Sequence, residues 1–292
     1  DLAVGLVVCI VFEQGESLLI AQIFKRFTAP CYTIFMSYKD TVIPIVRELQ
    51  KILLPEWGKA EIIDKKTERA TDILTLLDQK VEKFLKEKLA EIYPDIKFVG
   101  EENGGDRGAE RFWLVDPIDG TGHYMRGLPF CTVMLALIEK GAVTFSAIYD
   151  FLNDDIYSAE KGKGAYKNDT RIHVSGREFS DSYICTESKL NKKYNQAFFG
   201  EIVKNTPYFT SIDAGWEFAM VACGKLDARI CFDPWGNDYD FAAGSLLVSE
   251  AGGVVTNINS SEYDYRNLDF IAASPKAYEG LQNIFKEYKR PI

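Results

Sequence analysis

The sequence predicts a mixed α/β fold, and two patterns of apolar residues carry this prediction. Apolar residues recur at helical spacing in residues 42–54 and 73–89, which predicts two amphipathic helices. Apolar runs bounded by turn residues predict three antiparallel strands, at residues 132–139, 142–150 and 155–159. The chain of 292 residues is 47% hydrophobic and 26% charged, a globular balance. We therefore expect helices and antiparallel strands around a substantial core.

The other elements follow from local signals. Residues 59–71, between the two helices, are polar and charged, which favours a hairpin or loop. Short apolar runs at residues 96–100 and 112–115 predict two further strands, the second ending at an acidic motif. Glycine and asparagine in residues 161–169 predict another hairpin. Helical patterns return near the C-terminus, at residues 217–223 and 241–251.

The first 35 residues differ in pattern from the rest. Residues 2–12 form an eleven-residue apolar run, which is too short to span a bilayer. We expect residues 1–35 to be an extension outside the main fold; a short membrane-associating helix is the alternative. Residues 36–292 are expected to form one domain with two sub-layers, at about 36–180 and 181–292.

Charge and cysteine usage narrow the class of protein. The 43 acidic and 34 basic residues give a net charge of −9, which argues against binding a nucleic-acid polymer. The six cysteines form no C-x-x-C pair, and with only two histidines a zinc site is not predicted. Reduced, structural cysteines favour a cytoplasmic protein.

Residues 113–121, Trp-Leu-Val-Asp-Pro-Ile-Asp-Gly-Thr, are the most informative segment. Pro117 biases Asp116 to extended geometry, so we expect a strand, a tight turn and then a helix start. The carboxylates of Asp116 and Asp119 could converge with the Ile118 carbonyl on one side of such a turn. Such hard oxygen ligands beside the amides of Gly120 and Thr121 indicate a divalent metal ion acting on a phosphate. An ordinary Asp-Pro and Asp-Gly turn is the alternative.

Three further acids favour the metal interpretation. Asp78, Glu101 and Asp240 each lie at a predicted strand end or helix start, where α/β proteins place ligands. Taken singly, each also suits a helix cap or a solvated turn. Together with Asp116 and Asp119 they form an oxygen-only set, which suits Mg²⁺, or Mn²⁺ as a substitute.

Several motifs, taken in order, resemble the inositol monophosphatase family. The resemblance covers about residues 36–288 and includes the block 78–82 and the hairpin 159–165. Its most specific parts are Gly100-Glu101-Glu102, Trp113 with Asp116-Pro117-Ile118-Asp119-Gly120-Thr121, Asp240-Phe241-Ala242-Ala243-Gly244 and Glu250-Ala251-Gly252-Gly253.

The resemblance implies a layered α-β-α-β-α sandwich of the sugar phosphatase type and a lithium-sensitive, Mg²⁺-dependent phosphatase, commonly a homodimer. It implies two or three bound ions held by Glu101, Asp116, the Ile118 carbonyl, Asp119, Asp240 and Asp78. Thr121, hydrogen-bonded to Asp78, would help Glu101 to activate water. The amides of Gly120 and Thr121 would bind the phosphate.

One departure from the family concerns the alcohol part of the substrate. Inositol-cleaving members generally carry a glutamate where this chain has Cys231, and that glutamate holds sugar hydroxyls. Asp233, at a suitable spacing before Asp240, is a substitute, and the sequence leaves open which of the two positions serves. A second departure is Tyr239, which stands where the family usually has tryptophan.

The predicted activity is hydrolysis of a small sugar or polyol phosphate, with myo-inositol 1-phosphate as the default substrate. Fructose 1,6-bisphosphate, histidinol phosphate and 3′-phosphoadenosine 5′-phosphate are alternatives at the same site. A protein that interacts with the transcription machinery is an alternative of another class.

Overall fold

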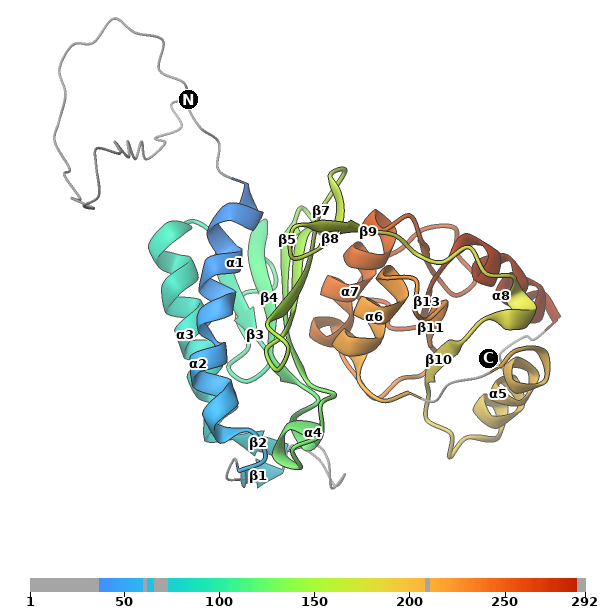
Figure 1. Cartoon of the computed structure of the whole chain (residues 1–292), viewed down its shortest axis with the longest axis horizontal. Coiled ribbons are helices and arrows are strands. Elements are labelled where there is room, and N and C mark those ends of the chain that lie inside the picture. The colour runs from blue at the N-terminus through green and yellow to red at the C-terminus, as the bar shows by residue number, and fades with distance from the viewer. Residues whose placement is uncertain (1–36, 60–61, 66–72, 208–210, 288–292) are drawn as a thin grey trace, which may run out of the picture. The chain divides into compact units, whose positions relative to one another are not determined.

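The computed structural model describes residues 37–59, 62–65, 73–207 and 211–287. A seven-stranded sheet separates two layers of helices (Figure 1). Its strands follow the chain in order, with β3 and β4 parallel and every later pair antiparallel. They are β3 (Lys97–Gly100), β4 (Arg111–Asp119), β5 (Thr132–Glu139), β6 (Ala142–Asp150), β7 (Asp155–Glu160), β8 (Gly164–Lys167) and β9 (Thr170–Ile172).

A four-stranded sheet in the order β10-β11-β13-β12 is formed by the C-terminal part of the chain. β10 and β11 are parallel, and the other two pairs are antiparallel. The strands are β10 (Ile184–Glu187), β11 (Ala228–Cys231), β12 (Val254–Asn257) and β13 (Phe270–Ala273). The parallel pair places the ends of β10 and β11 at one edge, where Glu187 and Cys231 are partners in the register.

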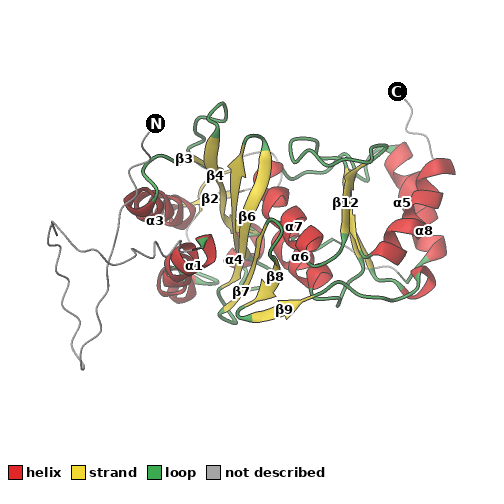
Figure 2. Ribbon diagram, turned by 90° about the horizontal axis from the view of Figure 1, so that it is seen from above, coloured by secondary structure: helices red, strands yellow, loops and turns green. Residues whose placement is uncertain are grey.

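Helices cover both faces of the seven-stranded and the four-stranded sheet (Figures 1 and 2). The outer face of the large sheet is covered by α1 (Tyr38–Glu48), α2 (Gln50–Leu53), the 3-10 turn η1 (Leu54–Glu56) and α3 (Leu76–Ile92). Between the sheets lie α6 (Ala214–Ala222) and α7 (Asp238–Glu250). Beyond the small sheet lie α5 (Lys193–Asn205), α8 (Pro275–Glu287) and the 3-10 turn η2 (Phe179–Asp181). The layered α-β-α-β-α fold predicted from the family resemblance is thereby confirmed.

Three hydrophobic clusters fill the spaces between these layers. One joins α1–α3 to the large sheet around Trp113, and a second joins the two sheets through α6 and α7 around Phe218 and Phe241. The third packs α5 and α8 on the small sheet around Phe198. α7 is buried along most of its length because it contacts both sheets, which explains its small, apolar residues.

The predicted helix over residues 73–89 was wrong at its start. Ile73–Thr75 forms strand β2, which pairs antiparallel with β1 (Ile62–Lys65). β1 lies within the region predicted as a hairpin or loop, and β2 lies beyond it. α3 begins only at Leu76, because the Thr75 side chain accepts hydrogen bonds from the amides of Leu77 and Asp78 and caps the helix.

The predicted end of the strand at residue 115 was also wrong. β4 continues through the acidic motif to Asp119, with a shift in its pairing to β5 between Asp116 and Asp119. Pro117 lies within this irregularity, where a strand tolerates a residue that cannot donate to the ladder.

The predictions for residues 1–35 lie outside the described residues. Within the described ranges, every helix is too short or too polar to cross a membrane.

Candidate active site

Three carboxylates, two of them buried and the third half-buried, converge where β4 ends and α7 begins. Asp116 and Asp119 come from the irregular end of β4, and Asp240 comes from the first turn of α7. One oxygen of each carboxylate lies within 4.8 Å of the others. The Asp116 carboxylate also accepts a hydrogen bond of 3.0 Å from the Ile118 amide. We call Asp116, Asp119 and Asp240 the three-acid cluster.

Mutual repulsion and burial favour the protonated form of this cluster. Burial, and then the negative charges of Glu101, Asp240 and Asp119, raise the pKa of Asp116 well above its usual value. Burial, and then the charges of Asp119 and Glu101, likewise raise the pKa of Asp240. A divalent cation would relieve this repulsion, which is the physical reason to regard the cluster as a cation site.

Asp119 is held by groups from the opposite side of the site. Its Oδ2 accepts a hydrogen bond of 2.5 Å from the Gly215 amide at the start of α6 and lies 3.4 Å from the Thr132 hydroxyl. Burial raises the pKa of Asp119 to about 6, although the Gly215 amide, Asp213 and Arg229 each oppose the increase. Asp119 is therefore the cluster acid with the most nearby support for its charged form.

Glu101 lies beside the cluster, just after β3. Its amide donates a hydrogen bond of 3.0 Å to the Val115 carbonyl, which ties the turn to β4. Glu82, buried on α3, supports the same turn: its carboxylate accepts the amides of Glu102 at 2.9 Å and Asn103 at 3.1 Å. The negative charge of Glu101 contributes to the raised pKa values of both Asp116 and Asp240.

Asp78 serves both as a helix cap and as a partner of Thr121. Its Oδ2 accepts hydrogen bonds from the Thr75 hydroxyl at 2.6 Å and the Thr75 amide at 2.8 Å. Its Oδ1 lies 3.4 Å from the Thr121 hydroxyl, which in turn lies 2.9 Å from the Ile118 carbonyl. The helix-cap alternative and the predicted contact with Thr121 are thus both present.

Gly120 connects the acidic motif to the short helix α4 (Thr121–Met125). Its φ of +79° is left-handed, and a Cβ there would lie 2.5 Å from Asp213 Oδ1 and 2.6 Å from the Phe130 carbonyl. Only glycine fits this position. The first amides of a helix have no partner within the helix, so those of Gly120 and Thr121 are potential donors at the start of α4.

Asp233 and Cys231 are not members of the three-acid cluster. The Asp233 carboxylate contacts Lys192 Nζ at 2.5 Å and the Tyr194 hydroxyl at 3.0 Å. Burial alone would raise its pKa, but hydrogen bonds from Lys192, Asn195 and Tyr194 outweigh burial and lower it to about 2. Cys231 is fully buried in the core, and burial raises the pKa of its thiol to about 12.

Asp213 is a site residue that the sequence did not indicate. It is buried immediately before α6, and Asp119 and Asp213 form a close pair. Burial, and then the charge of Asp119, raise the pKa of Asp213 well above its usual value. Its position before a helix of small residues resembles that of many capping acids, so only the approach of α6 to β4 identifies it.

The residues present fit a divalent cation. The donor atoms are carboxylate oxygens and a peptide carbonyl, which are the ligands that Mg²⁺ and Mn²⁺ prefer. Burial and mutual repulsion raise the pKa values of Asp116 and Asp240, and a divalent cation would offset this repulsion. Asp116, Asp119 and Asp240 are close enough together to share one ion.

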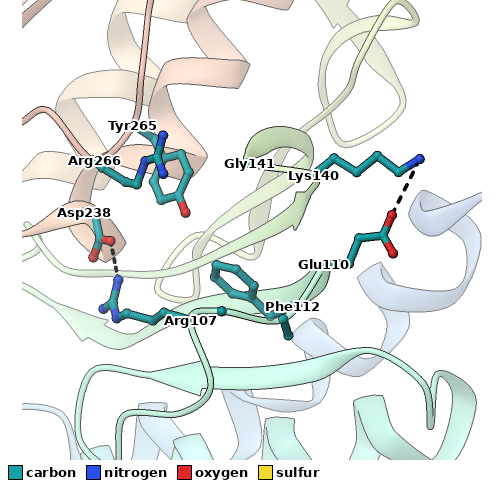
Figure 3. A pocket seen from close by; sticks show the side chains of 10 residues that line it. Arg107, Glu110, Phe112, Lys140, Gly141, Asp238, Tyr265 and Arg266 are labelled. Atoms are coloured by element: carbon teal, nitrogen blue, oxygen red, sulfur yellow. Dashed lines mark hydrogen bonds and ion pairs between the residues drawn. The ribbon is translucent and has the colours of Figure 1, made fainter.

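An open pocket of about 430 Å³ lies near the start of α7 (Figure 3). The described residues that line it include Asp238, which precedes Asp240 by two positions, but none of the three cluster acids. Arg107 pairs with Asp238, Lys140 with Glu110 at 3.6 Å, and Arg266 with Asp264 at 2.7 Å. Because its charged groups are already paired, the pocket is less suited to chemistry than the cluster.

Comparisons with known proteins identify the family to which this geometry corresponds. The model of the inositol monophosphatase family matches residues 37–290. A fructose-1,6-bisphosphatase/inositol-1-monophosphatase of Thermotoga maritima is 30% identical over 88% of this chain and 99% of its own length. A putative Nus factor SuhB of Neisseria meningitidis serogroup B is also 30% identical, over 86% of this chain and 98% of its own. The solved structure of a Thermotoga maritima IMPase superposes with a TM-score of 0.78 at 27% identity, covering 87% of this chain and 98% of that one.

Proposed function

The chain belongs to the inositol monophosphatase family and is a phosphoric monoester hydrolase, and on that premise we propose Mg²⁺-dependent hydrolysis of a small polyol or sugar phosphate. Proteins of this family generally use divalent metal ions. The observation that carries the proposal is the three-acid cluster, whose oxygens lie within 4.8 Å of one another beside Glu101 and Thr121.

Two or three Mg²⁺ ions would be held by side chains and one main-chain carbonyl around the end of β4. Glu101, Asp116 and the Ile118 carbonyl would hold the first, and Asp116, Asp119 and Asp240 the second. Asp78 and Glu101 would hold a weaker third. The bound cations would lower the pKa of a water molecule and stabilise the negative charge of the transition state.

Residues of the protein would orient the attacking water, accept its proton and bind the phosphate. The Thr121 hydroxyl, between the Ile118 carbonyl and Asp78, would orient the attacking water, and the Glu101 carboxylate would accept its proton. The amides of Gly120 and Thr121 would bind the phosphate oxygens. The turn that carries Glu101 is held in place by Glu82.

The proposal also covers which phosphate ester is hydrolysed and which residues bind its alcohol part. Myo-inositol 1-phosphate is the default, and fructose 1,6-bisphosphate, histidinol phosphate and 3′-phosphoadenosine 5′-phosphate are alternatives. Asp233 and Asp240 are the proposed acceptors for substrate hydroxyls. Since Asp233 is engaged by Lys192 and Tyr194, binding a hydroxyl there requires that these contacts rearrange.

The test is release of phosphate from these four esters by wild type and by Asp116→Asn, with and without Mg²⁺. We expect Mg²⁺-dependent release by wild type, inhibition by Li⁺, and a loss of about a thousandfold or more in the variant, which removes the shared ligand. Equal turnover by the two proteins would exclude the mechanism. The ester with the highest kcat/KM identifies the substrate class.

A second candidate function rests on the relative named putative Nus factor SuhB. We propose that a homodimer of this chain could also contact the transcription machinery. Co-purification with RNA polymerase, which Asp116→Asn should preserve, would separate this role from catalysis. Loss of co-purification in parallel with catalysis would argue against an independent interaction.

A further inference from the structure

Arg229 is a fully buried cation in the middle of β11, between the sheets. Its guanidinium carbon lies 5.2 Å from the centre of the Phe218 ring on α6 and 5.6 Å from that of Phe241 on α7. Phe241 directly follows Asp240. A buried charge is costly unless it is paired, so the partners of Arg229 define its role.

Two glutamates share the guanidinium. Nη2 of Arg229 donates to Glu187 Oε2 at 2.6 Å, and Nη1 donates to Glu217 Oε2. Glu187 comes from the end of β10, and Glu217 comes from α6. The side chain of Glu217 is fully buried, whereas that of Glu187 is 18% exposed. One arginine thus joins the small sheet to a helix between the sheets.

The second oxygen of each glutamate holds a loop of the active site. Glu187 Oε1 accepts the amides of Trp235 and Gly236, each at 2.9 Å. Glu217 Oε1 accepts the Ile212 amide at 2.6 Å. Each glutamate therefore links Arg229 to main chain that lies outside the regular elements.

These two loops lead directly to acids of the three-acid cluster. The loop at residues 234–237 enters α7, where the Asn237 amide donates to Asp240 Oδ2. The loop at residues 211–213 enters α6, where the Gly215 amide donates to Asp119 Oδ2. Both acids are proposed ligands of the second ion, so the two loops are connected to the same side of the cluster.

We propose that Arg229 is a positioning residue that, through Glu187 and Glu217, sets the separation of Asp119 and Asp240 for the second metal ion. This inference rests on the proposed metal-dependent function. The planar fork of arginine suits the role because it binds two carboxylates in fixed directions, which a lysine ammonium does not. Groups that orient metal ligands commonly change metal affinity about 10- to 100-fold when they are altered.

The test uses the full chain, with Mn²⁺ alone as the probe. Glu187→Gln keeps the size of a partly exposed side chain while removing its charge, and Arg229→Lys keeps the charge while removing the fork. The matched controls are Glu139→Gln, from a 2.7 Å pair with Arg111, and Arg177→Lys, from a pair with buried Asp227. Binding is measured by electron paramagnetic resonance of free Mn²⁺, and metal-free stability by thermal unfolding.

We expect Glu187→Gln and Arg229→Lys to weaken the second Mn²⁺ about tenfold or more, and to leave the first within about threefold. Saturating Mg²⁺ should restore kcat to within a few-fold of wild type. The controls should bind both ions as wild type does. If Arg229→Lys does not fold, Glu187→Gln decides the question alone.

Three outcomes would overturn the inference. Wild-type binding of both ions by Glu187→Gln would show that the network has no effect on the site. Equal weakening in Glu139→Gln would show that the loss follows from general destabilisation. A wild-type protein that binds no Mn²⁺ and releases no phosphate would overturn the proposed function, and this inference with it, so the two failures are distinguishable.

Discussion

The amide of Gly215 donates to Asp119 Oδ2 at 2.5 Å, across 96 positions of the chain. This contact brings the start of α6 against the end of β4. A Cβ at position 215 would lie 2.1 Å from the Thr132 hydroxyl and 3.0 Å from Asp119 Oδ2. The absence of a side chain at Gly215 therefore permits the closest approach between the two halves of the site.

Gly215→Ala should consequently impair the site. The added methyl group must displace Thr132 and Asp119, so we expect phosphate release to fall about 10- to 100-fold, with a higher Mg²⁺ requirement. Gly200→Ala is the matched control, because Gly200 lies in α5 and a Cβ there meets open space. The measurement is the Mg²⁺ dependence of kcat/KM. Wild-type kinetics in Gly215→Ala would contradict the importance of this contact.

The stability of the metal-free protein should decrease as the pH rises from about 4 to 7. The pKa of Asp119 is about 6 in the folded protein against a usual value of 3.8, so the folded state binds more protons in this range and stability falls with pH. Asp116, Asp213 and Asp240 have raised pKa values and act in the same direction.

Asp119→Asn isolates one part of this effect. Relative to the variant, wild type should lose about 2 kcal/mol of unfolding free energy between pH 4.5 and 7, because the pKa of Asp119 is about 6 in the folded protein against a usual value of 3.8. Saturating Mg²⁺ should remove the loss in wild type. Urea unfolding at pH 4.5 and 7 measures both quantities. A wild-type stability that increased relative to the variant across this range would contradict the direction of the pKa shift.

Thr75→Val should destabilise α3 and impair the site together. The Thr75 hydroxyl caps α3 and donates to Asp78 Oδ2, and its loss should cost about 1 kcal/mol of unfolding free energy. We also expect a several-fold decrease in kcat, because Asp78 Oδ1 lies next to the Thr121 hydroxyl. Thr170→Val, at an exposed position of β9, is the control. Thermal unfolding and phosphate release in the same preparation separate the two effects.

Glu82→Ala should release the turn that carries Glu101. It leaves the amides of Glu102 and Asn103 without their acceptor, at a cost of roughly 1–3 kcal/mol in unfolding free energy. We expect phosphate release to fall at least about tenfold because Glu101 is the proposed base. Glu87→Ala, exposed on the same helix, should have little effect on either quantity. Unchanged turnover in Glu82→Ala would show that the turn keeps its position without this support.

Local patterns predicted most of the fold because each depends on neighbouring residues. The antiparallel strands β5, β6 and β7 were predicted close to their observed bounds, since alternating and apolar runs report which residues face a core. β10 to β13, α5 and α8 were not predicted individually, and the bounds of α3 and β4 were wrong. α3 starts late because Ile73–Thr75 pair with β1 as strand β2, and β4 extends past Pro117 because it pairs with β5 at an irregular register. Both outcomes depend on pairing partners elsewhere in the chain.

The sequence by itself determined the family and the layered α/β fold, and it predicted that Asp116, Asp119 and Asp240 act together, because these acids stand in ordered motifs. Only the tertiary structure decided which groups surround them. Asp213, Glu82 and Arg229 are ordinary residues in the sequence, and they reach the site through contacts that depend on how α3, α6 and β11 pack. Such contacts join residues far apart in the chain, so no local periodicity records them.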